Sequence, residues 1–227
     1  MMTPILASLE KRSLESRATD EVRAAIVSRR FLPGRRLTEM QLAAELGVSR
    51  GTVRSALHTL LAEGLIAQRP YAAWEVVGLT AEDTWELYTL RAVLEGMGAE
   101  LTAAALAGQR ISADPLQVAF DALEQACQAG DIPAADEADL AFHKAVIASA
   151  GHGRLLGQYE RVQAQMRMLI GITNDKPASC MRLVPQHRAL LDVLLSGDAA
   201  RAAEQFREHA RIFGEETLRR LTTSAAA

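Results

Sequence analysis

Residues 41–64 read QLAAELGVSRGTVRSALHTLLAEG, and the stretch predicts two short helices joined by a tight turn. Thr38, just upstream, is followed three residues later by Gln41, which is the pattern of a capping box at a helix start. We expect the first helix to run to about Leu46, because Gly47 is a strong helix stop.

The second of these helices begins after Ser49, which is a good N-cap, and ends at Gly64. Its apolar residues recur at helical spacing, so we expect them to form one buried stripe: Val53, Leu57, Leu60 and Leu61. Two short helices joined by a glycine-containing turn form a helix-turn-helix, whose second helix can lie in the major groove of DNA.

Two arginines, Arg50 and Arg54, share one face of the predicted second helix because they are four residues apart. They lie near its N-terminus, where recognition helices present side chains to bases and phosphates. They could instead be solvated surface residues. However, a cation gains nothing from the helix dipole at that end, so a purely stabilising role explains them less well. We therefore predict that both contact DNA.

The flanking segments complete a winged helix. A helical pattern spans 18–29 and is broken by Pro33-Gly34, whereas 65–67 and 74–77 read as two short strands of a hairpin. The stretch PGRRLTEMQLAAELGVSRGTVRSALHTLLAEGLIAQRP resembles the DNA-binding domain of the GntR family of bacterial transcription regulators, over about residues 15–78. The resemblance implies a set of DNA contacts: Ser49, Arg50, Thr52 and Arg54, with Arg69 in the wing.

Three positions depart from the family pattern. The family often has proline where this chain has Thr52, and its wing tip commonly carries Arg-Gly where we place Ala72-Ala73. Some members also have an arginine at the position of Met40. Met40 cannot make that charged contact, and Ala72-Ala73 lacks the arginine with which the family's wing contacts the minor groove.

Composition sets the wider limits. The chain has 227 residues, 49% of them hydrophobic and only 4% aromatic, and Ala, Leu, Arg, Glu and Gln dominate long windows, so we expect a mainly α protein with a substantial core. Cys127 and Cys180 share no close-spaced motif, and no secretory signal opens the chain, so we expect a cytoplasmic protein with reduced thiols. No window is apolar enough to span a membrane.

Charge is distributed unevenly along the chain. Residues 1–80 hold 11 basic and 8 acidic residues, a balance of +3, whereas residues 81–227 hold 14 and 20, a balance of −6. A basic module beside an acidic one fits a nucleic-acid-binding head on a different kind of domain, although solubility alone could produce the same split. We place the domain boundary after residue 78, giving domains 1–78 and 79–227.

The second domain shows only helical patterns. We expect helices at 81–106, 114–128, 134–149 and 154–172, a fifth that ends at 196 and a sixth at about 198–221, which is enough for an antiparallel six-helix bundle. On the first of these helices we expect the following residues to face inward: Trp85, Leu87, Leu90, Leu94, Met97 and Leu101.

Four residues of the second domain could bind a metal. Asp139 and His143 lie four apart on one helix face, and His187 and His209 are nearly equidistant from the turn at 196–198, so an antiparallel hairpin brings them together. Three imidazoles and a carboxylate suit zinc, nickel, manganese or iron. The spacing by itself is also compatible with an ordinary ion pair and two unrelated histidines.

The segments ADLAFHKAVIASAG, PQHRALLDVLLSGDAARAA and REH resemble the FCD ligand-binding domain of the FadR-type branch of GntR regulators, and six helices resemble its VanR-type subgroup. The resemblance implies a divalent metal, zinc first, held by Asp139, His143, His187 and His209, and a carboxylate effector bound to that metal. Arg91 matches an arginine that helps to hold the effector, although it could simply pair with Glu95.

His152 stands where the family usually has asparagine, and it could contact the effector or end a helix. Together, these observations predict a homodimeric transcription regulator that binds paired half-sites in double-stranded DNA and responds to a small carboxylic acid. We expect a repressor, because most relatives are repressors. Two alternatives are a DNA-binding module whose helical domain only dimerises, and a metal-dependent hydrolase. The hydrolase is disfavoured because the chain has no HExxH motif, nucleophile motif or clear general base.

Overall fold

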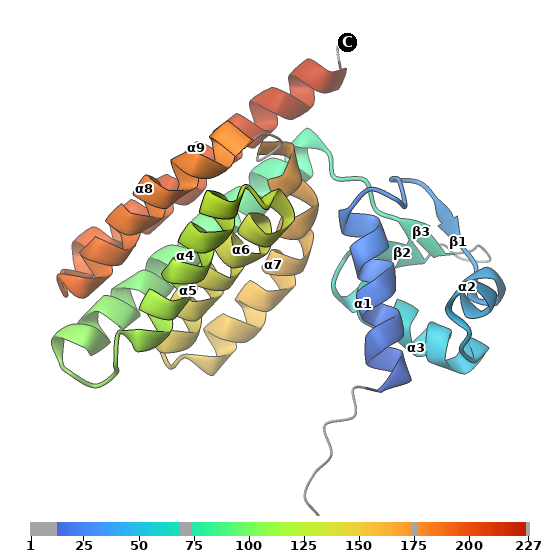
Figure 1. The fold of residues 1–227 in the computed structure, drawn as a ribbon, viewed down its shortest axis with the longest axis horizontal. Coiled ribbons are helices and arrows are strands. Elements are labelled where there is room, and N and C mark those ends of the chain that lie inside the picture. Colours follow the sequence, from blue (N-terminus) through green and yellow to red (C-terminus); the bar gives the residue numbers. More distant parts are fainter. Residues whose placement is uncertain (1–12, 69–73, 174–176, 226–227) are drawn as a thin grey trace, which may run out of the picture. The chain divides into compact units, whose positions relative to one another are not determined.

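The computed structural model describes residues 13–68, 74–173 and 177–225. The chain divides into two compact units, Met1–Gly78 and Leu79–Ala227. Within the described residues, the first unit contains three helices and a small sheet and the second contains six helices (Figure 1). The predicted fold class is confirmed: a winged helix-turn-helix precedes an all-helical domain.

The helices of the first unit are α1 (Leu14–Val27), α2 (Glu39–Leu46) and α3 (Arg50–Ala62). α2 and α3 begin after their predicted capping residues, whereas α1 begins at Leu14, four residues before the predicted start. The Thr38 side chain accepts a hydrogen bond from the Gln41 backbone N–H, as expected, but the Gln41 side chain donates to Glu45 rather than closing the capping box. Gly47 ends α2 with a φ of 65°, a left-handed conformation that glycine adopts without steric cost.

The sheet has three short antiparallel strands in the order β1-β3-β2. β2 (Ile66–Gln68) and β3 (Trp74–Val76) are the two predicted strands, and Ile66 pairs with Val76. β1 (Arg36–Leu37) was not expected, because two residues are too few to show an alternating pattern. Residues 69–73, which include the predicted contact Arg69 and the wing tip Ala72-Ala73, lie outside the described residues.

The core of the first unit lies between α1 and α3 and under the sheet. Its fully buried members are Val22 and Ile26 of α1, Val53, Leu57 and Leu60 of α3, and Leu37, Leu65 and Ile66. The prediction that Leu61 belongs to this stripe was wrong, because its side chain is exposed. It follows Leu60 directly and therefore lies about 100° further around the helix.

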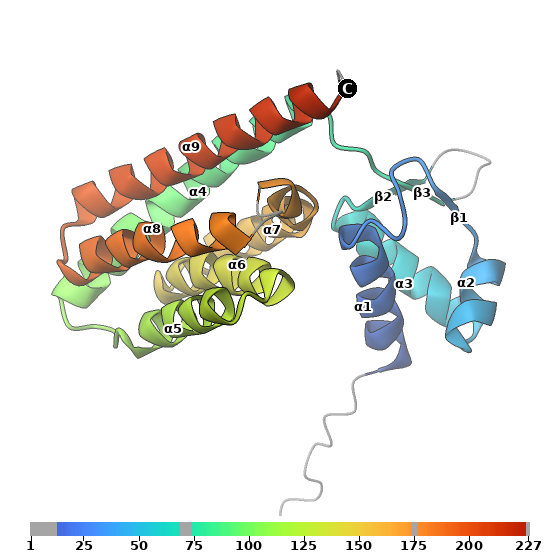
Figure 2. The same cartoon turned by 45° about the horizontal axis from the view of Figure 1, so that its top comes forward.

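The second unit is an antiparallel bundle whose helices match the predicted ones to within a few residues at each end. They are α4 (Ala81–Ala107), α5 (Asp114–Ala129), α6 (Ile132–Ser149), α7 (Gly153–Thr173), α8 (Pro177–Leu195) and α9 (Ala199–Ala225). α4 and α9 lie side by side as one layer, and the other four helices form the layer against them (Figure 2).

The bundle core is tightly packed around three aromatic rings, Phe120, Phe142 and Phe206, from three different helices. Small residues allow α4 to approach its neighbours closely. A Cβ atom at Gly98 would lie 2.3 Å from the end of the Ile147 side chain on α6, and one at Gly214 of α9 would lie 2.8 Å from Tyr88 of α4. α4 is therefore in close contact with both layers.

The outward face of α4 differs from the sequence prediction. Trp85, Leu90 and Met97 were expected to face inward, but all three are exposed, as is Val93. Leu87 is buried as predicted, and the inward face also carries Thr84, Tyr88, Arg91 and Glu95. α4 is apolar on both sides, so its periodicity could not identify the side that the bundle buries.

Among the described residues, no helix is both long and apolar enough to cross a membrane.

Candidate metal centre and DNA interface

The two arginines of the predicted recognition helix are exposed and lie on one side of α3, beside a carboxylate. Arg54 donates from Nε and Nη2 to the two carboxylate oxygens of Glu39, at 2.7 and 2.8 Å. Arg50 Nη2 lies 3.7 Å from the same carboxylate. The hydrogen bond from Arg54 is the main reason that the pKa of Glu39 is lowered. The paired geometry fixes the Arg54 side chain at the surface.

Glu39 is a residue of this interface that the sequence reasoning missed. It begins α2, 15 residues before Arg54, and no local pattern connects the two positions. The turn between α2 and α3 brings them together. An acidic residue in the first turn of a helix is explained equally well by the helix dipole, so only the tertiary structure shows that Glu39 pairs with Arg54.

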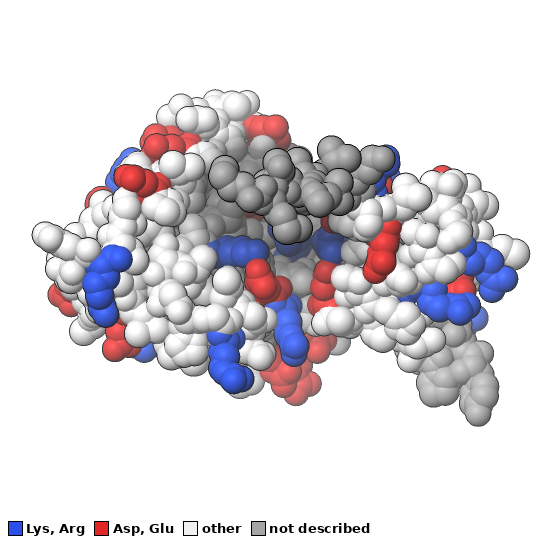
Figure 3. All heavy atoms as spheres, turned by 90° about the horizontal axis from the view of Figure 1, so that it is seen from below, with Lys and Arg blue, Asp and Glu red and all other residues white. Residues whose placement is uncertain are grey.

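The other predicted contacts of α3 form its N-terminal cap. Ser49 Oγ accepts a hydrogen bond from the Thr52 backbone N–H at 3.1 Å and lies 2.9 Å from Thr52 Oγ1. Both hydroxyls are exposed. On the face of the molecule seen in Figure 3, basic and acidic side chains are interspersed among uncharged ones, so the charge split of the sequence does not appear there as a continuous basic patch.

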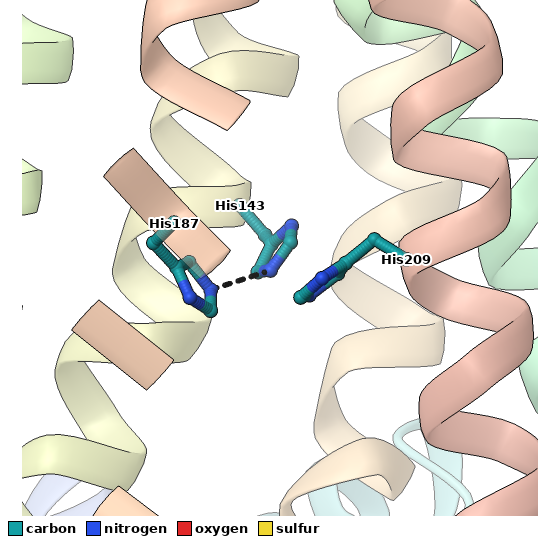
Figure 4. Close-up of side chains that lie close together, drawn as sticks. All are labelled: His143, His187 and His209. Carbon is teal, nitrogen blue, oxygen red and sulfur yellow. Dashed lines mark hydrogen bonds between the residues drawn. The ribbon is translucent and has the colours of Figure 1, made fainter. Parts of the chain in front are cut away.

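Three histidines converge inside the second unit, as the sequence spacing predicted. His143 of α6, His187 of α8 and His209 of α9 point toward one another (Figure 4), and one ligand nitrogen from each lies within 4.8 Å of the others. His143 and His187 are fully buried. The ring of His209 stacks on that of His143 with 5.1 Å between centroids.

Asp139 lies beside this cluster, one helical turn before His143. Its Oδ1 is 2.8 Å from His187 Nε2 and 4.0 Å from His143 Nε2. Burial raises the pKa of Asp139, but the charge of His187 and its hydrogen bond outweigh burial and leave the pKa well below its usual value. The carboxylate is therefore ionised and available as an oxygen ligand.

The two closest rings turn their Nε2 atoms toward each other. His187 Nδ1 lies 2.9 Å from the Leu183 carbonyl, which only accepts, so Nδ1 carries a proton and Nε2, which faces Asp139 Oδ1, is the nitrogen left for a metal. His143 Nε2 lies 3.1 Å from that atom. Two nitrogens that bind one ion at about 2.1 Å each are about 3.0–3.4 Å apart, so this pair fits a shared metal.

Burial keeps the rings of His143 and His209 neutral. Desolvation lowers the pKa of His143 and lowers that of His209 well below its usual value. A neutral imidazole is the form that binds a metal. Three imidazole nitrogens and one carboxylate, enclosed by the aromatic side chains of Phe142, Phe206 and Phe213, make a donor set for a divalent transition metal.

Arg91 makes the intrahelical pair that the sequence left open beside effector contact. Its Nε donates to Glu95 Oε1 at 2.6 Å, so the intrahelical pair exists. The side chain is only 2% exposed, and Nη2 is buried without a hydrogen-bond partner. A buried guanidinium nitrogen that lacks an acceptor is costly, which favours an additional acceptor at this position.

His152 ends up at a helix start. Its Nδ1 accepts a hydrogen bond from the Leu155 backbone N–H at 3.1 Å, and it therefore caps α7. This is the helix-end role that the sequence left open beside effector contact, and it occupies one of the two ring nitrogens.

Comparison with known proteins agrees with both halves of the fold. Residues 14–76 match the family of bacterial regulatory proteins named gntR, and residues 86–211 match the FCD domain. The transcriptional repressor GlaR of Escherichia coli K12 is 30% identical, over 81% of this chain and 86% of its own. The gluconate operon transcriptional repressor of Bacillus licheniformis is 25% identical, over 84% and 79%.

Among solved structures, McbR/YncC of E. coli superposes with a TM-score of 0.74, covering 94% of this chain and 99% of that one at 22% identity, which is a likeness of fold. The helix-turn-helix, the helical bundle and the two family matches agree. The chain belongs to the GntR family of DNA-binding transcription regulators, carries an FCD domain, and is not an enzyme.

Proposed function

We propose that this regulator is a homodimeric repressor whose affinity for its operator changes when a small carboxylic acid binds at a divalent metal in the helical unit. The observation that carries the proposal is the buried convergence of His143, His187, His209 and Asp139 in a chain that also has a winged helix-turn-helix. Repression is proposed because relatives such as GlaR are named repressors. The protein acts in the cytoplasm, where bacterial DNA is.

Zinc is the first choice of metal, with nickel, manganese or iron as alternatives that the same donor set accepts. The metal would be held by three imidazole nitrogens and Asp139, and it would supply an electrophilic centre for a carboxylate ligand. The unsatisfied Nη2 of Arg91 supports an anionic effector, because a guanidinium recognises a carboxylate through charge-assisted hydrogen bonds. Gluconate, which appears in the name of one relative's operon, is such an acid.

A dimer is supported by the outward face of α4. Trp85, Leu90, Val93 and Met97 are exposed and lie within an arc of about 140° around the helix. Two of them, Trp85 and Val93, also line a groove of about 420 Å³ between α4 and α9. A long helix that is apolar on both sides is normally buried on both sides, so we expect another protein surface to pack against this face.

The occupant we propose for that groove is the same groove of a second copy. Its α9 rim carries charges of both signs: Glu204, Arg207, Glu208, Arg211 and Glu215. A surface that carries both signs can be complementary to itself across a two-fold axis. Two copies would present two recognition helices, as paired half-sites require.

The position of α4 supplies a route from effector to DNA. Its inward face carries Arg91 and Glu95 at the histidine cluster, and its outward face is the proposed dimer surface. A ligand that binds one arrangement of the bundle better than another would shift the population between two arrangements of the dimer. The two heads would then fit paired half-sites to different extents.

The test begins with the DNA. Fragments of the source genome are selected on the purified, zinc-loaded protein at a stated moderate salt concentration, because phosphate contacts make binding salt-dependent. Enrichment of fragments with a short inverted repeat is expected, and substitution of Arg50 or Arg54 by alanine should abolish it. The matched control is Arg182→Ala, which changes a comparably exposed arginine of α8 that does not line the groove.

Operator affinity is then measured with a panel of carboxylic acids that includes gluconate, before and after treatment with a chelator. At least one acid should change the affinity of the metal-loaded protein but not of the chelated one. If a dimeric protein binds its operator equally in all these conditions, the helical unit only dimerises and the sensor proposal is wrong.

A further inference from the structure

Glu95 is a buried carboxylate at the histidine cluster that does not belong to the predicted ligand set. It lies on α4, and its side chain is only 1% exposed. Its Oε1 accepts hydrogen bonds from Arg91 Nε at 2.6 Å and from the Tyr159 hydroxyl at 2.9 Å. Both lone-pair directions of this oxygen are therefore used.

The second oxygen of Glu95 faces a metal-ligand candidate. Glu95 Oε2 lies 3.0 Å from His143 Nδ1, and neither atom has a hydrogen-bond partner of its own. Buried polar atoms are almost always satisfied, and a proton placed between these two satisfies both at once. As the ion-pair partner of Arg91, Glu95 is a carboxylate and can only accept, so the proton belongs to His143 Nδ1.

This placement determines what the rest of the His143 ring can do. With the proton on Nδ1, Nε2 carries a lone pair, and Nε2 is the atom that lies 3.1 Å from His187 Nε2. His187 Nδ1 faces the Leu183 carbonyl, so Nδ1 carries a proton in this ring too. Two different acceptors, one on α4 and one within α8, thus turn the Nε2 atoms of two rings toward the same point, beside Asp139.

We propose that Glu95 is the positioning residue of the metal centre: it fixes His143 in the tautomer that presents Nε2 to the metal, and through its other oxygen it ties this ligand to Arg91. The inference rests on the proposed metal centre and assigns a role that the ligand set does not include. A carboxylate behind a metal-bound histidine orients the ring and raises its basicity. Here the same carboxylate also holds the cation proposed to bind the effector, so effector and metal ligand share one partner.

Glu95→Gln is the informative variant because it reverses one hydrogen bond and keeps the others. The amide oxygen can still accept from Arg91 and Tyr159, whereas the amide nitrogen donates and would hold His143 with a bare Nδ1 and a protonated Nε2. A protonated Nε2 cannot bind a metal. The matched control is Tyr159→Phe, which removes a different partner of Glu95 and leaves the Glu95–His143 contact in place.

The first readout is the tautomer of His143 in the chelator-treated, full-length protein, from long-range ¹H–¹⁵N correlation spectra of histidine-labelled samples near neutral pH. We expect the Nδ1–H form in the wild-type and Tyr159→Phe proteins and the Nε2–H form in Glu95→Gln. The second readout is zinc affinity by competition with a chromophoric chelator, which should fall about 10- to 100-fold in Glu95→Gln and change little in Tyr159→Phe.

A folded Glu95→Gln protein that keeps the Nδ1–H tautomer and wild-type zinc affinity would overturn the inference, and Glu95 would be only the counter-ion of Arg91. If Glu95→Gln does not fold, Glu95→Asp retains the charge beside Arg91 but shortens the reach to Nδ1, and unchanged zinc affinity in that variant has the same meaning. Wild-type protein that binds no zinc would instead refute the metal centre itself.

Discussion

Val93→Glu should separate the proposed dimer into monomers. Val93 is 62% exposed on the outward face of α4 and lines the groove that we propose as the dimer surface. The groove already carries three acidic side chains, Glu204, Glu208 and Glu215, against two arginines. A further carboxylate at its apolar side would have to leave water when the second copy binds.

The size of the effect follows from burial. Complete burial of a valine side chain contributes about 1.5–3 kcal/mol, so covering the exposed part of Val93 contributes about 1–2 kcal/mol per copy. A two-fold interface contains the residue twice, which gives about 2–4 kcal/mol for the dimer. Desolvation of each new carboxylate adds several kcal/mol. The dissociation constant should therefore rise at least about 30- to 1,000-fold.

Sedimentation velocity across a dilution series measures this change directly. Val118→Glu is the matched control, because Val118 is also an exposed valine, 67% accessible, on α5, and it does not line the groove. Circular dichroism confirms that each variant is folded. If Val93→Glu and Val118→Glu have the same dissociation constant as the wild type, the α4 face is not the dimer surface.

Two further predictions concern the metal centre. Zinc at about 100 times its dissociation constant should stabilise the wild type by about 2.7 kcal/mol and raise Tm by about 5–11 °C. His209→Phe should lose this shift in a thermal melt, whereas His58→Phe, outside the cluster, should keep it; an equal shift in both would contradict the ligand set. Without metal, burial lowers the pKa values of His143 and His209 in the folded protein. Below about pH 6.5 the unfolded chain therefore binds more protons than the folded protein does. The free energy of unfolding should fall as the pH falls through that value. Urea unfolding at several pH values checks this, and a flat profile between about pH 7 and pH 5 would refute it.

The parts of the fold that the sequence predicts well depend on neighbouring residues. Thr38, Ser49 and Thr80 accept hydrogen bonds from backbone N–H groups three residues further on, and each marks a helix start. Capping and glycine stops are local interactions, so they can be recognised without tertiary contacts. The i, i+4 spacing and the symmetry about one turn indicated that the four candidate ligands could meet, and the resemblance to the FCD domain implied that they bind a metal.

The errors have a common physical origin. Leu61, Trp85, Leu90 and Met97 were expected inside because they continue apolar patterns, yet each is exposed in the single chain. Periodicity shows that a helix has an apolar face, but it does not show what covers that face. For α4, apolar residues on both sides left the choice to the packing against α6 and α9, where Gly98 and Gly214 permit close approach.

By itself, the sequence determined the winged helix-turn-helix and the six-helix bundle, because both follow from local chemistry and from spacing along a helix. It also marked the arginines of the recognition helix as candidate DNA contacts, and the resemblance to the FCD domain marked the candidate metal ligands. Only the tertiary structure decided that Glu39 holds Arg54 and that Glu95 lies between Arg91 and His143. His143 is 48 residues from Glu95 in the chain, and Glu39 is 15 residues from Arg54. Such partners are selected by the packing of helices, which leaves no periodic trace in the sequence.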